Sequence, residues 1–155
     1  MAIAFAIVGI PLGLVILLGI GWLVANVDDW SRDLTTNTAS TSPDAKNPSL
    51  RPISTTASME ILADLVASSA GELPGWELVG RDEAAGEVTL RFVRTTRLMR
   101  FKDDITVHIR SLPQENAPPG SELAAESKSR LGKADFGQNP RNLRELMDKV
   151  RSSLP

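Results

Sequence analysis

The protein has 155 residues, which is enough for one domain or for one domain with an anchor. Its formal net charge of −2 argues against a general nucleic-acid binder, because such a protein needs a clearly basic face. The absence of cysteine excludes disulfides, thiolate zinc sites and cysteine nucleophiles, and the single histidine, His108, excludes every site that needs two histidines.

Residues 1–27 carry no charged side chain. As a helix, residues 2–27 would be about 39 Å long at ~1.5 Å per residue, whereas the hydrocarbon core of a bilayer is ~30 Å thick. The pattern predicts a transmembrane anchor over residues 1–27, with Trp22 and Trp30 at the membrane interface, where indole rings prefer to lie. A cleaved signal peptide is the alternative, but it would need a basic start and a better cleavage site than Leu-Val-Ala at residues 23–25.

Glycines recur along the predicted anchor. Gly9 and Gly13 have the small-xxx-small spacing that lets two membrane helices approach closely, and Gly19 and Gly21 lie further along. This pattern predicts packing of the anchor against other integral membrane proteins. The alternative is that glycine is simply common in membrane helices.

The sidedness of the predicted anchor depends on few charges. Under the positive-inside rule, the basic residues that follow it would place the domain in the cytoplasm; they are Arg32, Lys46 and Arg51. The acidic pair Asp28 and Asp29 and the positive amino terminus favour the opposite orientation. We expect a single-pass protein of the bacterial inner (cytoplasmic) membrane with a periplasmic domain.

After the predicted anchor the composition changes twice. Residues 28–53 are rich in Thr, Ser, Asn and Pro and have almost no large apolar side chain, which predicts an extended linker. Residues 54–155 regain periodic apolar positions and predict one small domain. Hydroxyl side chains at 54–56 are candidate caps of a first helix, whose apolar positions have helical spacing and which ends near Gly71.

Strands are expected next. A turn is predicted around residues 81–86, and strict alternation then predicts strands around 87–92, 105–110 and 122–130. A last helix follows, with Asn139 as cap and Pro140 in its first turn. The predicted fold class is α+β, a small antiparallel sheet of three or four strands flanked by two helices, with one sheet face covered by the helices and the other face polar.

Two stretches of the second half carry a resemblance to a known family: RFVRTTRLMRFKDDITVHIR and SKSRLGKADFGQNPRNLREL. They resemble the bacterial and plastid family known as domain of unknown function 1499, over about residues 43–154. The matching positions are Phe101, Asp103 and Asp104, then Ser127, Ser129, Arg130, Gly132, Asp135, Phe136, Gly137, Asn139 and Asn142, with a basic residue at Arg141 or Arg144. Many relatives have a cysteine-containing opening where this chain has TSPDAKNPS, so any role of those cysteines is absent here.

The resemblance implies a fold and a membrane or exported setting, but no agreed chemistry. We interpret the motif as structural: Gly132 and Gly137 permit positive φ in a tight strand-to-helix connection, and Asp135 can bond nearby backbone amides while Phe136 plugs the gap between sheet and helix. The functional alternative is an anion site at the start of the last helix.

Few residues offer catalytic chemistry. Asp104, His108 and Arg110 fall on the polar side of one predicted strand and could form a hydrolase or small-ligand site, or simply a solvated face with ion pairs. A Ser-His-Asp site with Ser127 or Ser129 lacks a nucleophile elbow. The densest basic run could bind lipid phosphate or an acidic partner, or be an ordinary charged hairpin; it comprises Arg91, Arg94, Arg97, Arg100 and Lys102.

The sequence therefore favours a non-catalytic single-pass membrane protein. We expect it to act as an accessory or assembly subunit of a larger membrane protein complex, and by analogy with the family the expected host is photosynthetic or respiratory. The expected partners are other integral membrane proteins and lipid, with no nucleic acid, no metal and no cofactor. The alternative remains a membrane-anchored hydrolase or small-ligand-binding domain.

Overall fold

A computed structural model of the chain describes residues 36–114, 119–132 and 137–154, together with the helical positions Leu14, Leu17, Leu18 and Gly21. Apart from these four positions, the predicted anchor lies outside the described residues, and so do Gly9, Gly13, Gly19, Trp22 and Trp30. Among the residues described, no helix is both long enough and apolar enough to cross a bilayer.

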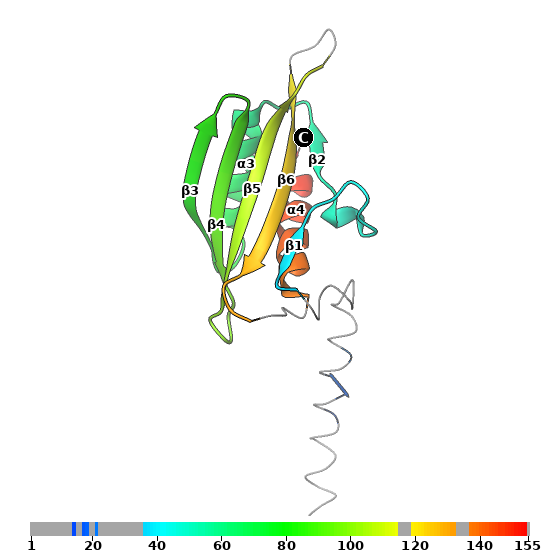
Figure 1. The fold of residues 1–155 in the computed structure, drawn as a ribbon, viewed down its shortest axis with the longest axis vertical. Coiled ribbons are helices and arrows are strands. Elements are labelled where there is room, and N and C mark those ends of the chain that lie inside the picture. Colours follow the sequence, from blue (N-terminus) through cyan, green and yellow to red (C-terminus); the bar gives the residue numbers. More distant parts are fainter. Residues whose placement is uncertain are drawn as a thin grey trace, which may run out of the picture.

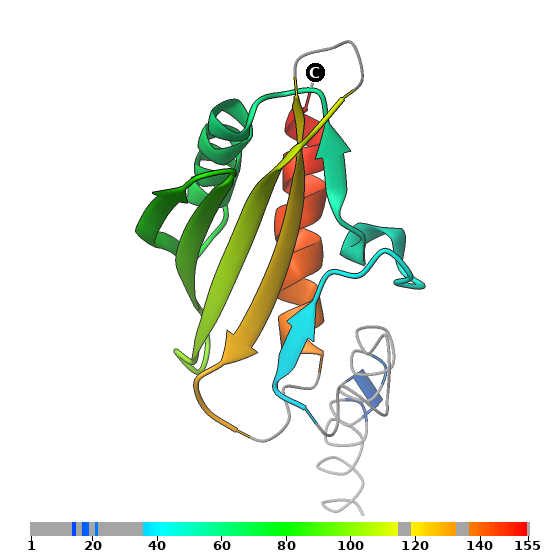
Figure 2. The ribbon, with the colours of Figure 1, turned by 45° about the horizontal axis from the view of Figure 1, so that its top comes forward.

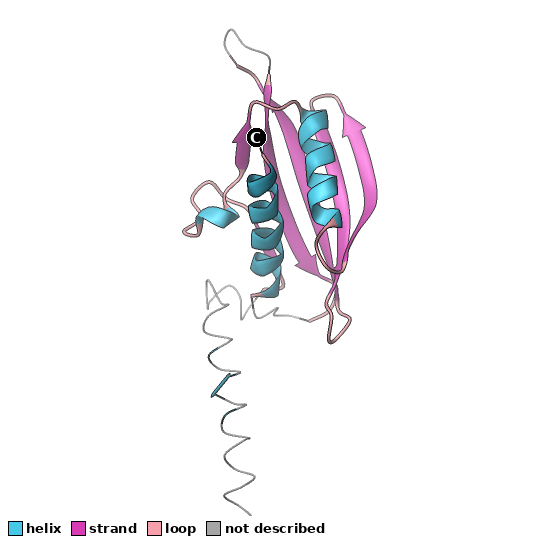
Figure 3. Cartoon of the chain, turned by 180° about the vertical axis from the view of Figure 1, so that it is seen from behind, coloured by secondary structure: helices cyan, strands magenta, loops and turns pink. Residues whose placement is uncertain are grey.

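The domain is an antiparallel sheet of six strands with two helices on one of its faces (Figures 1 and 3). The strands are β1 (Thr38–Ser40), β2 (Ile53–Thr55), β3 (Trp76–Ala84), β4 (Glu87–Thr95), β5 (Lys102–Leu112) and β6 (Gly120–Ser129). The helices are α3 (Met59–Gly71) and α4 (Gln138–Ser153), and a short 3-10 helix, η1 (Pro48–Leu50), precedes β2. The predicted class, α+β with two helices, is confirmed.

The sheet has the order β1-β6-β5-β4-β3. Its four long strands pair in chain order, which needs only short connections between antiparallel neighbours. Both short strands pair with the remaining edge of β6: β1 lies opposite Glu126 to Lys128, and β2 lies opposite Ser121 to Leu123. The segment before α3 therefore covers an edge of β6 that would otherwise present unpaired backbone groups.

The core lies between the two helices and the sheet face that they cover. The positions predicted to point inward are buried: Val88, Leu90 and Phe92 on β4, Ile105, Val107 and Ile109 on β5, and Leu123 and Ala125 on β6. They pack against Leu62 and Val66 of α3 and Leu143, Leu146, Met147 and Val150 of α4. At one border of this core, the rings of Trp76 and Phe92 meet edge to face, with centroids 6.0 Å apart.

The predicted number of strands, three or four, is too small. β1 and β2 are only three residues long and polar in sequence, so pairing with β6 rather than a side-chain pattern makes them strands. β3 continues through the stretch where a turn is predicted and reaches Ala84. Because β3 is an edge strand in which only Trp76 is buried, its sequence lacks the alternation of a half-buried strand.

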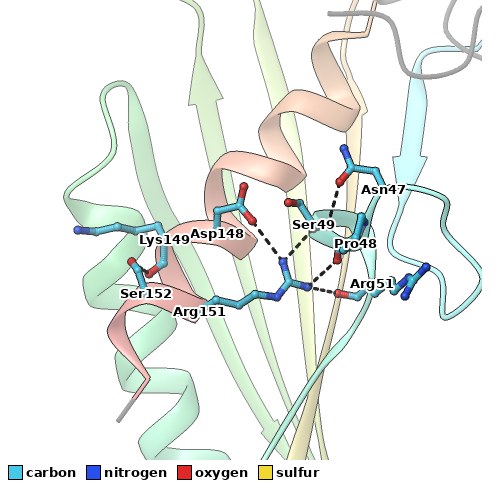
Figure 4. A network of polar contacts seen from close by, with 8 residues as sticks. All are labelled: Asn47, Pro48, Ser49, Arg51, Asp148, Lys149, Arg151 and Ser152. Atoms are coloured by element: carbon cyan, nitrogen blue, oxygen red, sulfur yellow. Dashed lines mark hydrogen bonds and ion pairs between the residues drawn. The ribbon is translucent and has the colours of Figure 1, made fainter.

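Part of the stretch predicted as an extended linker packs on the domain. Leu50 and Ile53 are buried in the core. Arg151, near the end of α4, holds η1 through backbone carbonyls, as Figure 4 shows: its guanidinium donates to the carbonyl oxygens of Arg51 at 2.6 Å, Pro48 at 3.1 Å and Ser49 at 3.3 Å. Two apolar side chains and one distant arginine order a segment whose composition resembles a linker.

Both helix starts differ from the prediction. The cap of α3 is Ser58, whose hydroxyl accepts a hydrogen bond from the Ile61 amide at 3.4 Å, while Ser54 and Thr55 belong to β2. At the start of α4, the residue before the helix is Gly137, whose φ of 78° lies in the left-handed region. Asn139 lies inside the first turn and not at the cap, because its side chain is engaged in the core.

Neighbouring residues on α3 test the packing of this core. Leu62→Ala should lower the free energy of unfolding by about 2–5 kcal/mol, since Leu62 is fully buried. Ile61→Ala is the matched control and should change it by only about 0.5 kcal/mol, because Ile61 is 63 % exposed. Urea unfolding of the full chain in mild detergent, followed by circular dichroism, measures both; equal losses would contradict the packing.

Candidate functional site

Five polar side chains are buried together between β5, β6 and α4. They form what we call the polar cluster, with exposed fractions of 0–8 %: Asp103, Ser127, Ser129, Asn139 and Asn142. They meet because Asp103 lies opposite Ser129 in the β5–β6 ladder, and because Ser127 and Ser129 continue the inward row of β6. The first turns of α4 supply the two asparagines.

The Asp103 carboxylate is the charged member of the polar cluster. One of its oxygens accepts a hydrogen bond from the Ser129 hydroxyl at 2.7 Å, and the other accepts one from the Asn142 amide at 2.9 Å. A buried carboxylate is costly unless it is hydrogen-bonded, and both oxygens of this one have partners. The carboxylate thereby links the last strand to the last helix.

Further hydrogen bonds close the polar cluster into a network. The Asn142 amide also donates to the Ser127 hydroxyl at 3.1 Å. That hydroxyl donates to the Asn139 side-chain carbonyl at 2.6 Å, and the Asn139 amide donates to the Ser129 hydroxyl at 3.0 Å. Since each side chain serves at least two others, the network fixes the position of α4 against the sheet.

The polar cluster also holds the segment that leads into β1. The Asn139 amide donates to the backbone carbonyl of Asn37 at 2.7 Å. The Asn37 amide in turn donates to the backbone carbonyls of Gly132 at 2.9 Å and Ser129 at 3.3 Å. Gly132 has a φ of 92°, the positive value predicted for this connection. Sequence reasoning misses Asn37, because it lies in the predicted linker.

Asp104 points to the opposite side of the sheet from its neighbour Asp103, as strand alternation predicts. Its carboxylate accepts hydrogen bonds from the Arg130 guanidinium, with Nη2 at 2.6 Å and Nε at 2.9 Å from its two oxygens. This ion pair, through its hydrogen bonds first and its charge second, raises the pKa of Arg130. Asp104 therefore serves as the partner of Arg130 on the open sheet face.

His108 and Arg110 meet a different acid on the same face. Glu87 accepts hydrogen bonds from His108 Nδ1 at 2.7 Å and from Arg110 Nε at 3.2 Å. These two bonds, the one from His108 first, hold the pKa of the Glu87 carboxyl below its ordinary value. The structure thus brings two of the three candidate residues, His108 and Arg110, together at Glu87. Asp104 is four residues from His108 along β5, which corresponds to about 13 Å at ~3.3 Å per residue.

One end of the sheet is hollowed. The β4–β5 turn, the end of β6 and the beginning of β1 lie there together (Figures 1 and 2). Between them opens a groove of about 510 Å³, which we call the basal groove. It is lined by apolar side chains, Leu98, Met99, Phe101 and Leu131, by cationic ones, Arg94, Arg97, Lys102 and Arg141, and by Asp103 and Ser129 of the polar cluster.

Arg94 lies at the inner part of the basal groove. Its side chain is only 15 % exposed, and its Nη2 atom is 3.4 Å from the Glu145 carboxylate of α4. Within the described part of the chain, its buried Nε and Nη1 atoms have no hydrogen-bond partner. Because these two atoms are closed off from solvent, the Arg94 guanidinium contributes its positive charge to the groove and not a hydrogen bond to an anion in it.

The other predicted site residues are spread over several places. Phe101 is 47 % exposed and lines the basal groove, whereas Asp135 and Phe136 lie outside the described residues. Sequence reasoning misses the exposed apolar groups Leu98 and Met99, although a Leu-Met pair between two arginines in RTTRLMRFK is an available signal. Over the described ranges, no group of three or more His, Asp or Glu side chains is placed to hold a metal.

Comparison with known families agrees with the sequence motif. The family described as Protein of unknown function (DUF1499) matches residues 29–150, which is most of the chain, and the protein belongs to this family. The resemblance drawn from the motif is confirmed. The match begins two residues after the end of the predicted anchor and includes the polar cluster and the basal groove. No curated protein matches the chain.

The adjacent acids of β5 test the role of the polar cluster. Asp103→Asn should lower the free energy of unfolding by about 1–3 kcal/mol, because an amide places a donor against one of the two donors that now bind the carboxylate. Asp104→Asn, the control with the same change, removes an exposed ion pair and should cost less than about 1 kcal/mol. A larger loss for Asp104→Asn in denaturant unfolding would contradict this assignment.

The Glu87 ion pair should make stability depend on pH. Because its pKa is lower in the folded state, Glu87 stabilises the fold above its ordinary pKa of 4.5, and this contribution is lost as the pH falls through the lowered value. The stabilisation that Glu87 provides relative to Glu87→Gln should therefore shrink as the pH falls below 4.5. The shrinkage should be weaker in a His108→Gln background; an unchanged profile there would exclude His108 as the main cause.

Proposed function

We propose that this protein is a non-catalytic, single-pass membrane protein that serves as an accessory or assembly subunit of a larger membrane protein complex. Its partners in this proposal are other integral membrane proteins, reached through residues 1–27 and the start of the linker, together with lipid. By analogy with the organisms that the family resemblance implies, the host is a photosynthetic or respiratory complex of a bacterial inner membrane, with the domain in the periplasm.

The polar cluster is the observation that carries the non-catalytic part of the proposal. It contains the motif side chains best suited to chemistry, namely a carboxylate and two hydroxyls. A general base or nucleophile has to reach a substrate atom. Asp103 and Ser129 border the basal groove, but they are only 1 % and 8 % exposed and are hydrogen-bonded to each other and to the asparagines of α4. Such an arrangement supports a role in holding the fold.

The uncharged stretch supports the membrane part of the proposal. Residues 2–27 are long enough to cross a hydrocarbon core that is ~30 Å thick. Gly9 and Gly13 supply the spacing for close packing against another helix. The family domain follows from residue 29, so the domain would lie beside the bilayer with its open sheet face available to a partner.

Purification of the tagged full chain from native membranes in a mild detergent tests the proposal. The tag belongs at the carboxyl end, which lies away from the basal groove (Figure 1). The protein should migrate well above its own mass of 16.7 kDa plus detergent, together with a fixed set of integral membrane proteins. A monomer under gentle conditions would overturn the subunit role, and recovery in the soluble fraction would overturn the membrane role.

Two matched variants sharpen this experiment. Gly9→Leu with Gly13→Leu should leave the protein in the membrane but release most of the co-migrating proteins, because bulky side chains keep the helices apart. Val8→Leu with Ile10→Leu changes the same segment without altering the glycines and should retain the partners. Equal retention by both pairs would contradict packing through the glycines.

A further inference from the structure

We infer that the end of the domain that carries the basal groove is a membrane-docking surface for anionic lipid. In this arrangement the β4–β5 turn inserts its apolar side chains among the lipid headgroups, and the cations of the groove bind lipid phosphate. The inference rests on the proposed function in one respect, since it takes residues 1–27 as the membrane anchor.

The apolar side chains at this end are unusually exposed. Leu98 is 89 % exposed, Leu131 68 % and Met99 62 %. They come from two different loops that meet, because the Arg130 amide donates to the Lys102 carbonyl at 3.0 Å. Single exposed apolar residues are ordinary, but several at one end form a patch that favours an apolar environment.

The β4–β5 turn holds these side chains at a defined place. The Thr96 amide donates to the Phe101 carbonyl at 2.8 Å, and the Arg100 amide donates to the Thr96 carbonyl at 3.1 Å. The Thr96 hydroxyl accepts a further hydrogen bond from the Phe101 amide at 2.9 Å. Leu98 and Met99 therefore sit at the tip of a closed turn, so that little ordering is needed when the tip enters a headgroup layer.

Cations flank the apolar tip. Arg97 and Lys102 line the basal groove from the turn, and Arg100 lies between them in the sequence. Deeper in the groove, the Arg94 guanidinium adds its positive charge, although its Nε and Nη1 atoms are closed off from solvent. The carboxylate that lines the groove, Asp103, already binds Ser129 and Asn142 through both oxygens. An apolar tip flanked by cations matches the chemistry of an anionic lipid surface.

The path of the chain places this same end next to the bilayer. Asn37 is hydrogen-bonded to the carbonyl of Gly132, so the chain enters the domain beside Leu131 and the groove. Residues 28–36 alone connect this point to the predicted anchor, and these residues can span at most roughly 32 Å at ~3.3–3.6 Å per residue. The β3–β4 turn and the carboxyl terminus lie at the opposite end of the domain (Figure 1).

These observations select lipid over a protein or peptide as the occupant of the surface. A short connection to a membrane segment keeps lipid headgroups at a high effective concentration near the groove. Binding to the groove then needs no additional protein partner. The neighbouring open sheet face, whose charges pair within the chain as Asp104 with Arg130 and Glu87 with Arg110, lacks both the apolar tip and the groove.

Site-specific labelling of the full chain tests the inference, because the protein has no cysteine of its own. Leu98→Cys carries an environment-sensitive fluorophore, and Ala85→Cys in the β3–β4 turn is the control. Each protein is reconstituted in phosphatidylcholine vesicles with or without phosphatidylglycerol, and quenching by spin-labelled lipid is measured. The Leu98 label should shift to the blue and be quenched about twofold or more strongly in the anionic vesicles, while the Ala85 label stays water-like.

Two matched double variants test whether the additional quenching depends on the cations of the groove or only on the net charge of the protein. Arg97→Gln with Lys102→Gln should abolish the additional quenching at position 98. Arg110→Gln with Lys128→Gln removes the same charge from the open sheet face and β6 and should retain it. Equal quenching in neutral and anionic vesicles, or equal effects of the two pairs, would overturn the anionic-lipid site.

Two further outcomes are decisive. In neutral vesicles, millimolar inorganic phosphate at matched ionic strength should not reproduce the blue shift and the quenching of the Leu98 label; if it did, a free anion would be sufficient and the anionic-lipid docking surface would be overturned. Flotation with the vesicles shows, independently of the Leu98 label, whether the protein is anchored in the membrane. Protein that floats while the Leu98 label remains water-like contradicts only the docking surface, whereas protein that fails to float contradicts the proposed membrane function as well.

Discussion

The hydrogen bonds of the Asp103 carboxylate hold together the part of the domain where sheet, last helix and first strand meet. A carboxylate in a low-dielectric interior is stable only when its oxygens are paired, and here the Ser129 hydroxyl and the Asn142 amide provide that pairing. One position of α4 satisfies all these bonds, because Asn139 must at the same time reach Ser127 and the backbone of Asn37. The apolar core supplies the bulk of the packing, and the polar cluster determines how the helix is placed on it.

The same network positions the end of the molecule for which we propose a membrane contact. Gly132 and Asn37 are joined by a hydrogen bond beside the polar cluster, and Asp103 and Ser129 line the basal groove. The groove therefore has a rigid inner wall, while its outer rim consists of a turn closed by Thr96. A rigid frame of this kind can present exposed apolar side chains without collapsing over them.

Strand alternation gives the two adjacent acids of β5 different roles. Asp103 faces the helices and is 1 % exposed, whereas Asp104 faces solvent and binds Arg130. The open face carries a second ion-pair group around Glu87, which binds His108 and Arg110. Exposed pairs of this kind contribute little to stability but supply a polar, patterned surface for recognition. In our proposal that surface meets the partner subunits while the apolar end meets lipid.

Features that depend on local composition and periodicity could be predicted from the amino-acid sequence: the uncharged residues 1–27, the inward rows of β4, β5 and β6, the amphipathic α4 and the family motif. Alternation also predicted that Asp103 and Asp104 face opposite ways. Three further features are visible only in the folded domain: β1 and β2 are strands, Arg151 orders η1, and Leu98 and Leu131 lie at the same end. The physical reason is that these features depend on hydrogen bonds and contacts with residues far away in the chain, such as Asn37 with Gly132, and no local pattern of side chains records such partners.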